Sequence, residues 1–86
     1  MTITDVKVRR LLDDERLKAI VSITLDGEFA VHDIKVIDSG GRLFVAMPSR
    51  KDQEGVYRDI AHPVTSAFRE MTERLVLSAY RAALSS

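Results

Sequence analysis

The run of residues 23–51 constrains the fold most, because it alternates strand-like apolar segments with sharp turn signals. Asp26 and Gly27 stand between two apolar stretches, and Asp-Gly is a favoured pair for a type I′ turn, in which both residues need positive φ. Residues 39–41, Ser-Gly-Gly, mark a second turn. Tight turns in succession join neighbouring antiparallel strands, so this run predicts an antiparallel sheet built from hairpins.

Three segments around these turns have the pattern of strands. Near the N-terminus, Thr4, Val6 and Val8 alternate with charged residues. This pattern predicts a half-buried strand whose other face is exposed to solvent and basic. Residues 43–47 are apolar throughout and predict a strand that ends at Pro48, because proline lacks a backbone donor. Residues 18–25 predict a central strand, with Ile20 interrupting its polar side and four apolar residues on one face: Ala19, Val21, Ile23 and Leu25.

The strand between the two turns changes its apolar frame. Phe29 and Val31 share one frame, whereas Ile34 and Val36 lie one position out of step, with the change at residues 32–33. A β-bulge there would restore a single inward face. Alternatively, both faces of this strand are covered over different stretches, one by a helix and one by another protomer.

The rest of the chain changes from strand-like to helical near Pro63. Residues 49–55 predict a polar loop, and residues 56–60 a short fifth strand at a sheet edge. Residues from about 65 to 84 are good helix formers, and Thr65 or Ser66 can serve as the N-cap. The sequence therefore predicts one α+β domain over residues 1–86. A strand-rich part, 3–61, forms an antiparallel meander of four to five strands, and one C-terminal helix packs on it.

The predicted helix carries an apolar stripe at three- and four-residue spacing, which should pack on the sheet. Its members are Val64, Phe68, Met71, Leu75, Ala79 and Ala82. Val76, Leu77 and Tyr80 fall outside this stripe and widen the apolar face beyond what one sheet surface needs. A second contact surface, between the subunits of an oligomer, is the interpretation for these three residues.

Composition limits the classes of protein to consider. The chain has 86 residues, thirteen Lys plus Arg against thirteen Asp plus Glu, and no cysteine. A chain this short buries only about 60% of the surface that its unfolded form exposes, so oligomerisation is a reasonable expectation. The balanced charge means that any nucleic-acid binding must come from a local patch. With neither a signal-peptide pattern nor an apolar stretch of membrane-spanning length, we expect a cytoplasmic protein that does not engage a membrane.

Few residues suggest catalysis. His32 and His62 lie thirty positions apart, and their spacing hardly supports a metal site with the nearby Asp33 and Asp59. A strand bulge and the turn before Pro63 account for the two histidines more simply. The serines occupy no nucleophile elbow, and the Gly-Gly pair resembles no phosphate loop. We therefore expect no catalytic residue, metal, cofactor or small-molecule substrate.

Arg50 and Lys51 are the best candidates for binding, because they follow Pro48 in a predicted loop from which long cations can reach outward. Arginine can hold a phosphate in bidentate fashion, and lysine adds a mobile point charge. The nearby carboxylates of Asp52 and Glu54 would partly cancel this field, and such a pair is often only a solvated turn. Other residues could extend the patch if the fold brings them to the same side: Lys7, Arg9, Arg58, Arg69 and Arg74.

Five segments of the chain resemble the stage V sporulation protein G (SpoVG) family over about residues 4–80. They are TDVKVRR, AIVSITLD, VHDIKVID, LFVAMPSRK and YRDIAHP. Members of this family are small bacterial cytoplasmic proteins, described as site-specific DNA-binding regulators that affect septation, sporulation or virulence genes. Some of them also bind RNA. The family fold is an antiparallel sheet followed by a C-terminal helix, assembled as a homodimer.

The resemblance therefore implies a homodimeric, DNA-binding regulator of septation- or sporulation-type gene expression, with RNA as a second class of partner. It places the DNA contacts at the basic pair and at the start of the helix, here Arg50, Lys51, Ser66 and Arg69. Together with Arg58 from the extended patch, these are the site residues that we expect. The alternative function is a protein-interaction module that regulates cell division through its apolar dimer surface, Val76 and Tyr80 included. In that case, salt should affect binding little.

Overall fold

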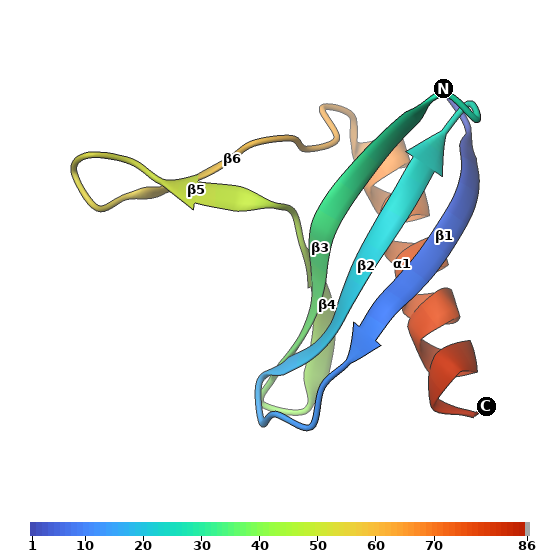
Figure 1. Cartoon of the computed structure of the whole chain (residues 1–86), viewed down its shortest axis with the longest axis horizontal. Coiled ribbons are helices and arrows are strands. Elements are labelled where there is room, and N and C mark those ends of the chain that lie inside the picture. The colour runs from blue at the N-terminus through green and yellow to red at the C-terminus, as the bar shows by residue number, and fades with distance from the viewer. Residues whose placement is uncertain (86) are drawn as a thin grey trace.

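The computed structural model describes residues 1–85 and contains two antiparallel sheets and one helix. The helix covers one face of the larger sheet, whose strand order is β1-β2-β3-β4 (Figure 1). This arrangement confirms the predicted α+β fold. No helix in the described part is long and apolar enough to cross a membrane. The elements are β1 (Ile3–Leu11), β2 (Leu17–Leu25), β3 (Phe29–Ser39), β4 (Arg42–Ala46), β5 (Ser49–Lys51), β6 (Tyr57–Asp59) and α1 (Ser66–Leu84).

Both predicted turns join neighbouring strands of the larger sheet. Asp26 and Gly27 have φ values of +53° and +66°, as a type I′ turn requires, and the Glu28 amide donates to the Leu25 carbonyl at 2.9 Å. At the β3–β4 turn, the Gly41 amide donates to Asp38 Oδ1 at 2.9 Å. These local sequences fix two hairpins and hence the order of three strands.

A bulge in β3 decides between the two interpretations of its apolar frame. Val21 pairs with Ile34, but Ile23 pairs with Val31, so β3 has one residue more than β2 over this stretch. Asp33 lies in the bulge with a φ of +63°, a left-handed conformation that aspartate tolerates better than most residues. The extra residue returns Ile34 to the helix-facing side, where it is fully buried. One inward face results, as the bulge hypothesis predicted.

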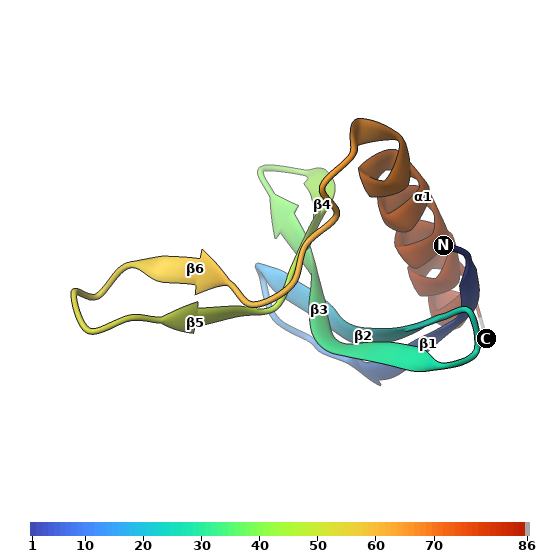
Figure 2. The same cartoon turned by 90° about the horizontal axis from the view of Figure 1, so that it is seen from above.

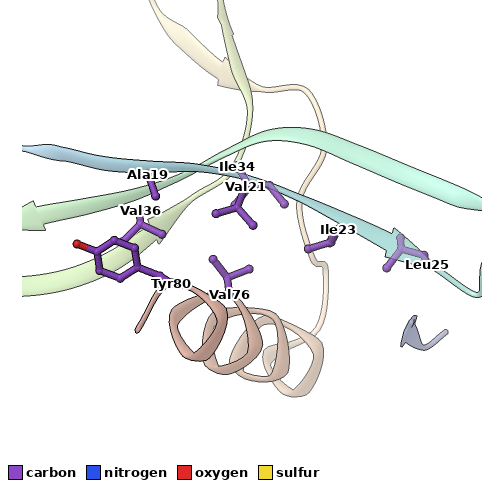
Figure 3. Close-up of a cluster of buried hydrophobic side chains, with 8 residues drawn as sticks. All are labelled: Ala19, Val21, Ile23, Leu25, Ile34, Val36, Val76 and Tyr80. Atoms are coloured by element: carbon purple, nitrogen blue, oxygen red, sulfur yellow. The ribbon is translucent and has the colours of Figure 1, made fainter. Parts of the chain in front are cut away.

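The core lies between the larger sheet and α1. Figure 3 shows the side chains of β2 and β3 pointing toward Val76 and Tyr80 of the helix. The four residues predicted to share one face of β2 are all buried. The buried apolar residues are Ala19, Val21, Ile23, Leu25, Ile34, Val36, Val76 and Tyr80.

The helix presents a different row of side chains from the predicted stripe. Thr72, Val76 and Tyr80 are its buried residues, whereas Val64, just before the helix, is 87% exposed and Met71 is 37% exposed. Thr72 is compatible with burial because its hydroxyl donates to the Phe68 carbonyl at 2.7 Å, so no polar group is left unpaired. The prediction that Val76 and Tyr80 form an intersubunit surface is therefore wrong, since both are core residues of a single protomer.

The segment predicted as a loop and an edge strand forms a separate two-stranded ribbon, which we call the arm (residues 49–59). Arg50 and Lys51 lie in strand β5, not in a loop, and β6 pairs with β5 instead of extending the larger sheet. Pro48 ends the ladder of β4, and beyond it the chain extends again and turns back at residues 52–56. The Ile60 amide closes the base of the arm by donating to the Pro48 carbonyl at 2.8 Å.

Candidate nucleic-acid interface

The arm projects from the end of β4, on the opposite side of that strand from α1 (Figure 2). Its strands pair in register, with Arg50 opposite Arg58 and Lys51 opposite Tyr57. Residues directly opposite each other share a face of a ribbon, and neighbours along a strand alternate between faces. One face of the arm is therefore formed by the two arginines. Ser49, Lys51, Tyr57 and Asp59 form the other.

The two arginines make an electrostatically unfavourable cross-strand pair. Like charges directly opposite each other destabilise a sheet, so this face gains stability from an anion placed over it. Arg58 Nε donates to Asp52 Oδ2 at 2.8 Å, which neutralises one of the two cations. In the part of the chain that the structure describes, this is the one ion pair, and Arg50 has no carboxylate within 4.0 Å. The guanidinium of Arg50 is thus exposed and available for an external anion.

Asp52 organises the tip of the arm. Its Oδ1 accepts the backbone amides of Glu54 at 2.9 Å and Val56 at 3.0 Å, while its own amide donates to the Val56 carbonyl at 2.9 Å. The hydrogen bond from Arg58 lowers the pKa of the Asp52 carboxyl from its ordinary value of 3.8, and the Val56 amide adds to this effect. The charged form is favoured because each of these donors binds it more strongly than the neutral acid. Asp52 thus removes charge from the arm and also fixes its turn.

Lys51 lies on the second face of the arm, beside an aromatic ring. Its Nζ is 6.0 Å from the centroid of the Tyr57 ring, at the outer limit of a cation–π contact. Both side chains are exposed. The ammonium group therefore retains most of its freedom to reach an anion near the edge of the ribbon.

The predicted residues of the helix do not join this cluster. Ser66 is the first residue of α1, and Thr65 is its N-cap, accepting the Phe68 amide at 3.2 Å through its side chain. Arg69 Nη2 donates to the Pro63 carbonyl at 3.3 Å. The structure brings Arg50, Lys51 and Arg58 together in the arm, and it leaves Ser66 and Arg69 on the other side of β4 (Figure 2).

Among the residues first considered as extensions or as metal ligands, Arg9 and the two histidines have local contacts. Arg9 Nε donates to Ser22 Oγ at 3.3 Å, and the same hydroxyl lies 2.8 Å from His32 Nδ1. His62 Nδ1 lies 3.2 Å from the Pro63 carbonyl. Over residues 1–85, no three His, Cys, Asp or Glu side chains gather closely enough to hold a metal ion.

An apolar groove of about 430 Å³ lies between the start of α1, the end of β2 and the start of β3. Sequence reasoning missed it, although Phe29, next to the first turn, and Val64 were visible as apolar residues at the ends of their segments. Phe29 is 66% exposed. The lining includes Met1, Phe29, Val31, Met47, Val64 and Phe68.

These features define a small α+β domain that carries a projecting basic ribbon. The sequence model of the SpoVG family matches residues 1–82. A protein of Heliobacterium modesticaldum is 55% identical over 86 residues, covering 100% of this chain and 97% of its own length. A protein of Lachnospira eligens is 53% identical over 83 residues, covering 96% and 94%. One of Exiguobacterium sibiricum is 54% identical over 80 residues, covering 93% and 78%.

All three of these relatives carry the name "Putative septation protein SpoVG". The chain belongs to the SpoVG family. The name ties the family to septation and does not describe an enzyme activity.

Proposed function

We propose that this protein is a cytoplasmic nucleic-acid-binding regulator of septation- or sporulation-type gene expression, acting as a homodimer without catalysis. DNA is the expected ligand, and RNA is the second class. The arm supplies the contacts, with Arg50 and Lys51 as its free cations and Arg58 as the partner of Asp52.

The observation that supports this proposal most is the pairing of Arg50 with Arg58 on one face of an exposed ribbon. A two-stranded ribbon has dimensions that the major groove of DNA admits. A phosphate group placed over this face would neutralise Arg50, the cation that Asp52 leaves unpaired, and could accept hydrogen bonds from both guanidinium groups. The zero net charge of the chain makes such a local site the expected source of affinity.

The salt dependence of DNA binding should therefore report the number of phosphate contacts. If each protomer makes about two phosphate contacts, a dimer makes about four, and log affinity falls against log salt with a slope of roughly −3.6. Replacing Arg50 and Lys51 together by alanine removes two contacts from each protomer, so binding weakens and the slope of the dimer flattens by up to about 3.6, because each lost contact removes about 0.9. Fluorescence anisotropy at several salt concentrations, on defined DNA and RNA, measures both quantities.

The matched control removes two positive charges from a different surface of the protein. Arg74 and Arg81 are exposed on α1, and their double alanine variant should keep the slope of the unmodified protein. An unchanged slope in the Arg50 and Lys51 variant would show that the arm is not the site.

The alternative function, a protein-interaction module, loses the surface first assigned to it, because Val76 and Tyr80 are buried within one protomer. A division protein could still dock at the apolar groove, where Phe29 and Val64 are exposed. Its binding would depend little on salt and would survive the loss of Arg50 and Lys51. The salt titration therefore separates the two functions.

A further inference from the structure

Basic side chains gather around the Ser22 hydroxyl on the face of the larger sheet that α1 does not cover. Figure 2 shows this face free of other elements beneath β1, β2 and β3. Ser22 alternates with the buried core residues of β2, so its side chain points to this outer face. Lys7 is its direct partner on β1, and side chains opposed in this way have Cβ atoms about 5 Å apart. We call Lys7, Arg9, Ser22 and His32 the sheet cluster.

The Ser22 hydroxyl orients two members of the sheet cluster. Arg9 Nε can only donate, and it lies 3.3 Å from Ser22 Oγ, while His32 Nδ1 lies 2.8 Å from the same oxygen. The Ser22 O–H is thus left to donate to Nδ1 of a neutral imidazole, and a second lone pair of Oγ can accept from a protonated one. In both cases the Nε2–H of His32 remains a donor. Because Ser22 is only 6% exposed, the hydroxyl is a fixed point beneath the two side chains.

The basic side chains of the cluster lack acidic partners. Lys7, Arg9 and His32 are exposed, and over residues 1–85 none of them has a carboxylate within 4.0 Å. Arg9 uses one of its five N–H donors on Ser22, which leaves the four on its terminal nitrogens for an external acceptor. Like charges held together on one face of a sheet are destabilising. The cluster therefore combines unused donors with unbalanced positive charge.

The wider face also keeps a positive balance. Arg10 and Lys35 lie in the next row of the same face, each paired with Ile20. With Lys7 and Arg9 they make four Lys and Arg side chains, against two carboxylates that adjoin the cluster in sequence, Asp5 on β1 and Asp33 in the β3 bulge. Local charge of this kind attracts anions even though the whole chain is neutral.

We propose that the sheet cluster binds a phosphate group, held by the charges of Lys7 and Arg9 and by the Nε2–H of His32. Phosphate suits these donors because its oxygens accept several charge-assisted hydrogen bonds at once, and the terminal nitrogens of Arg9 can hold two oxygens side by side. The phosphate belongs either to the backbone of a polynucleotide or to a free phosphate compound. The site does not involve the arm. In the polynucleotide case it rests on the proposed function and adds one contact per protomer.

Pyrophosphate is a suitable probe, because it carries phosphate charge without a base or a sugar. In a titration followed by NMR, the ring nitrogens of His32 should shift and saturate, whereas those of His62 should not. Replacing Lys7 and Arg9 together by glutamine should weaken the affinity reported by the His32 shift at least about tenfold, since two charge-assisted contacts are lost. The matched control, Arg74→Gln with Arg81→Gln, removes two charges from exposed positions on α1 and should keep that affinity.

A second variant separates positioning from charge. Ser22→Ala keeps every charge of the cluster but removes the hydroxyl that orients Arg9 and His32. The His32 shift should then need a several-fold higher concentration of pyrophosphate, and Ser22→Thr, which retains a hydroxyl, should restore the original affinity. Circular dichroism checks that both variants are folded. A folded Ser22→Ala protein with unchanged affinity would overturn the positioning role of the hydroxyl.

The salt dependence of DNA and RNA binding identifies the source of the phosphate. A polynucleotide that uses the site makes two more contacts per dimer, so the slope is steeper by about 1.8 than with the arm alone. The Lys7 and Arg9 variant should lose this amount. A slope that the variant leaves unchanged, together with pyrophosphate binding by the unmodified protein, assigns the site to a free phosphate compound.

The outcomes separate this inference from the proposed function. If pyrophosphate does not shift His32, or if the Lys7 and Arg9 variant binds it as tightly as the control does, the sheet cluster is not a phosphate site and the function of the arm is unaffected. If pyrophosphate binds at His32 while neither DNA nor RNA binds even at low salt, the proposed function fails and the phosphate site stands.

Discussion

At the scale of single residues, Asp52 has the most consequences for the arm. Its carboxylate accepts two backbone amides at the tip and the guanidinium of Arg58 across the ribbon. Sequence reasoning considered this residue only as a charge that weakens the basic pair. In the structure it neutralises Arg58 but not Arg50, so it makes the two arginines of one face unequal.

The lowered pKa of Asp52 gives a prediction with a definite sign. Because the folded arm favours the ionised carboxylate, the stabilisation of the tip is complete above the ordinary value of 3.8 and is lost as pH falls through the lowered pKa. In a titration of the Asp52 side-chain carbon by NMR, the midpoint should lie below 3.8, and the Val56 amide signal should change with the same midpoint.

The control for this titration is Arg58→Ala, which removes the largest cause of the shift. Its midpoint should move back toward 3.8 while remaining below it, because the amides of Glu54 and Val56 still donate to the carboxylate. A midpoint at or above 3.8 in the unmodified protein, or one that Arg58→Ala does not move, contradicts the assigned hydrogen bonds.

At the scale of elements, α1 shows which row of side chains holds the sheet and helix together. Val76 is fully buried, and Val64, a member of the predicted stripe, is 87% exposed. Val76→Ala should lower the free energy of unfolding by about 2 kcal/mol, through lost apolar burial and the cavity left behind. Val64→Ala should change it by less than about 0.5 kcal/mol.

Thermal unfolding measures this difference. In a domain of this size, a loss of about 2 kcal/mol lowers the midpoint by roughly 8–16 °C, whereas the Val64 variant should unfold close to the unmodified protein. Equal shifts for the two variants would mean that the helix packs through the stripe first predicted from the sequence. Val64 lies before the helix, and Val76→Ala raises helix propensity, so propensity cannot account for the expected loss of stability.

The same elements show why part of the fold was predictable and part was not. The hairpins depend on a few adjacent residues, and Asp26-Gly27 predicts its turn without reference to the rest of the chain. The rotation of α1 depends on tertiary packing, and Thr72 was not counted as apolar although its hydroxyl is satisfied within the helix. The arm was predicted only in part: residues 56–60 were expected to form a strand at the edge of the sheet, but β5 was missed, because it has three polar residues and follows Pro48, which was taken as the end of regular pairing.

The candidate site was predictable only in its residue types. Arg50 and Lys51 were identified from their charge and position. Arg58 was expected to join them only if the fold brought it to the same side, because sequence cannot show which strands will pair. The opposition of Arg50 and Arg58 follows from the register of β5 and β6, which the turn around Asp52 and Gly55 sets. Arg69, grouped with them through the resemblance, lies on another element.

At the scale of the whole molecule, the exposed arm and the uncovered face of the larger sheet connect folding to assembly. Five half-buried apolar residues lie on that face and form what we call the outer patch: Leu17, Ile20, Ile37, Phe44 and Ala46. If the arm is ordered by a second copy, the dimer is more stable than the monomer, and mass action makes the thermal midpoint rise with protein concentration. Over a hundredfold range of concentration, we expect a clear rise for the unmodified protein and almost none for Phe44→Asp, which places a charge in the outer patch. Calorimetry combined with sedimentation at each concentration measures midpoint and mass together.

Since Phe44 is outside the core cluster, the variant monomer should still fold and should match the midpoint of the unmodified protein at the lowest concentration. A midpoint that is independent of concentration in the unmodified dimer, or one that Phe44→Asp leaves rising, would mean that the patch does not carry the assembly.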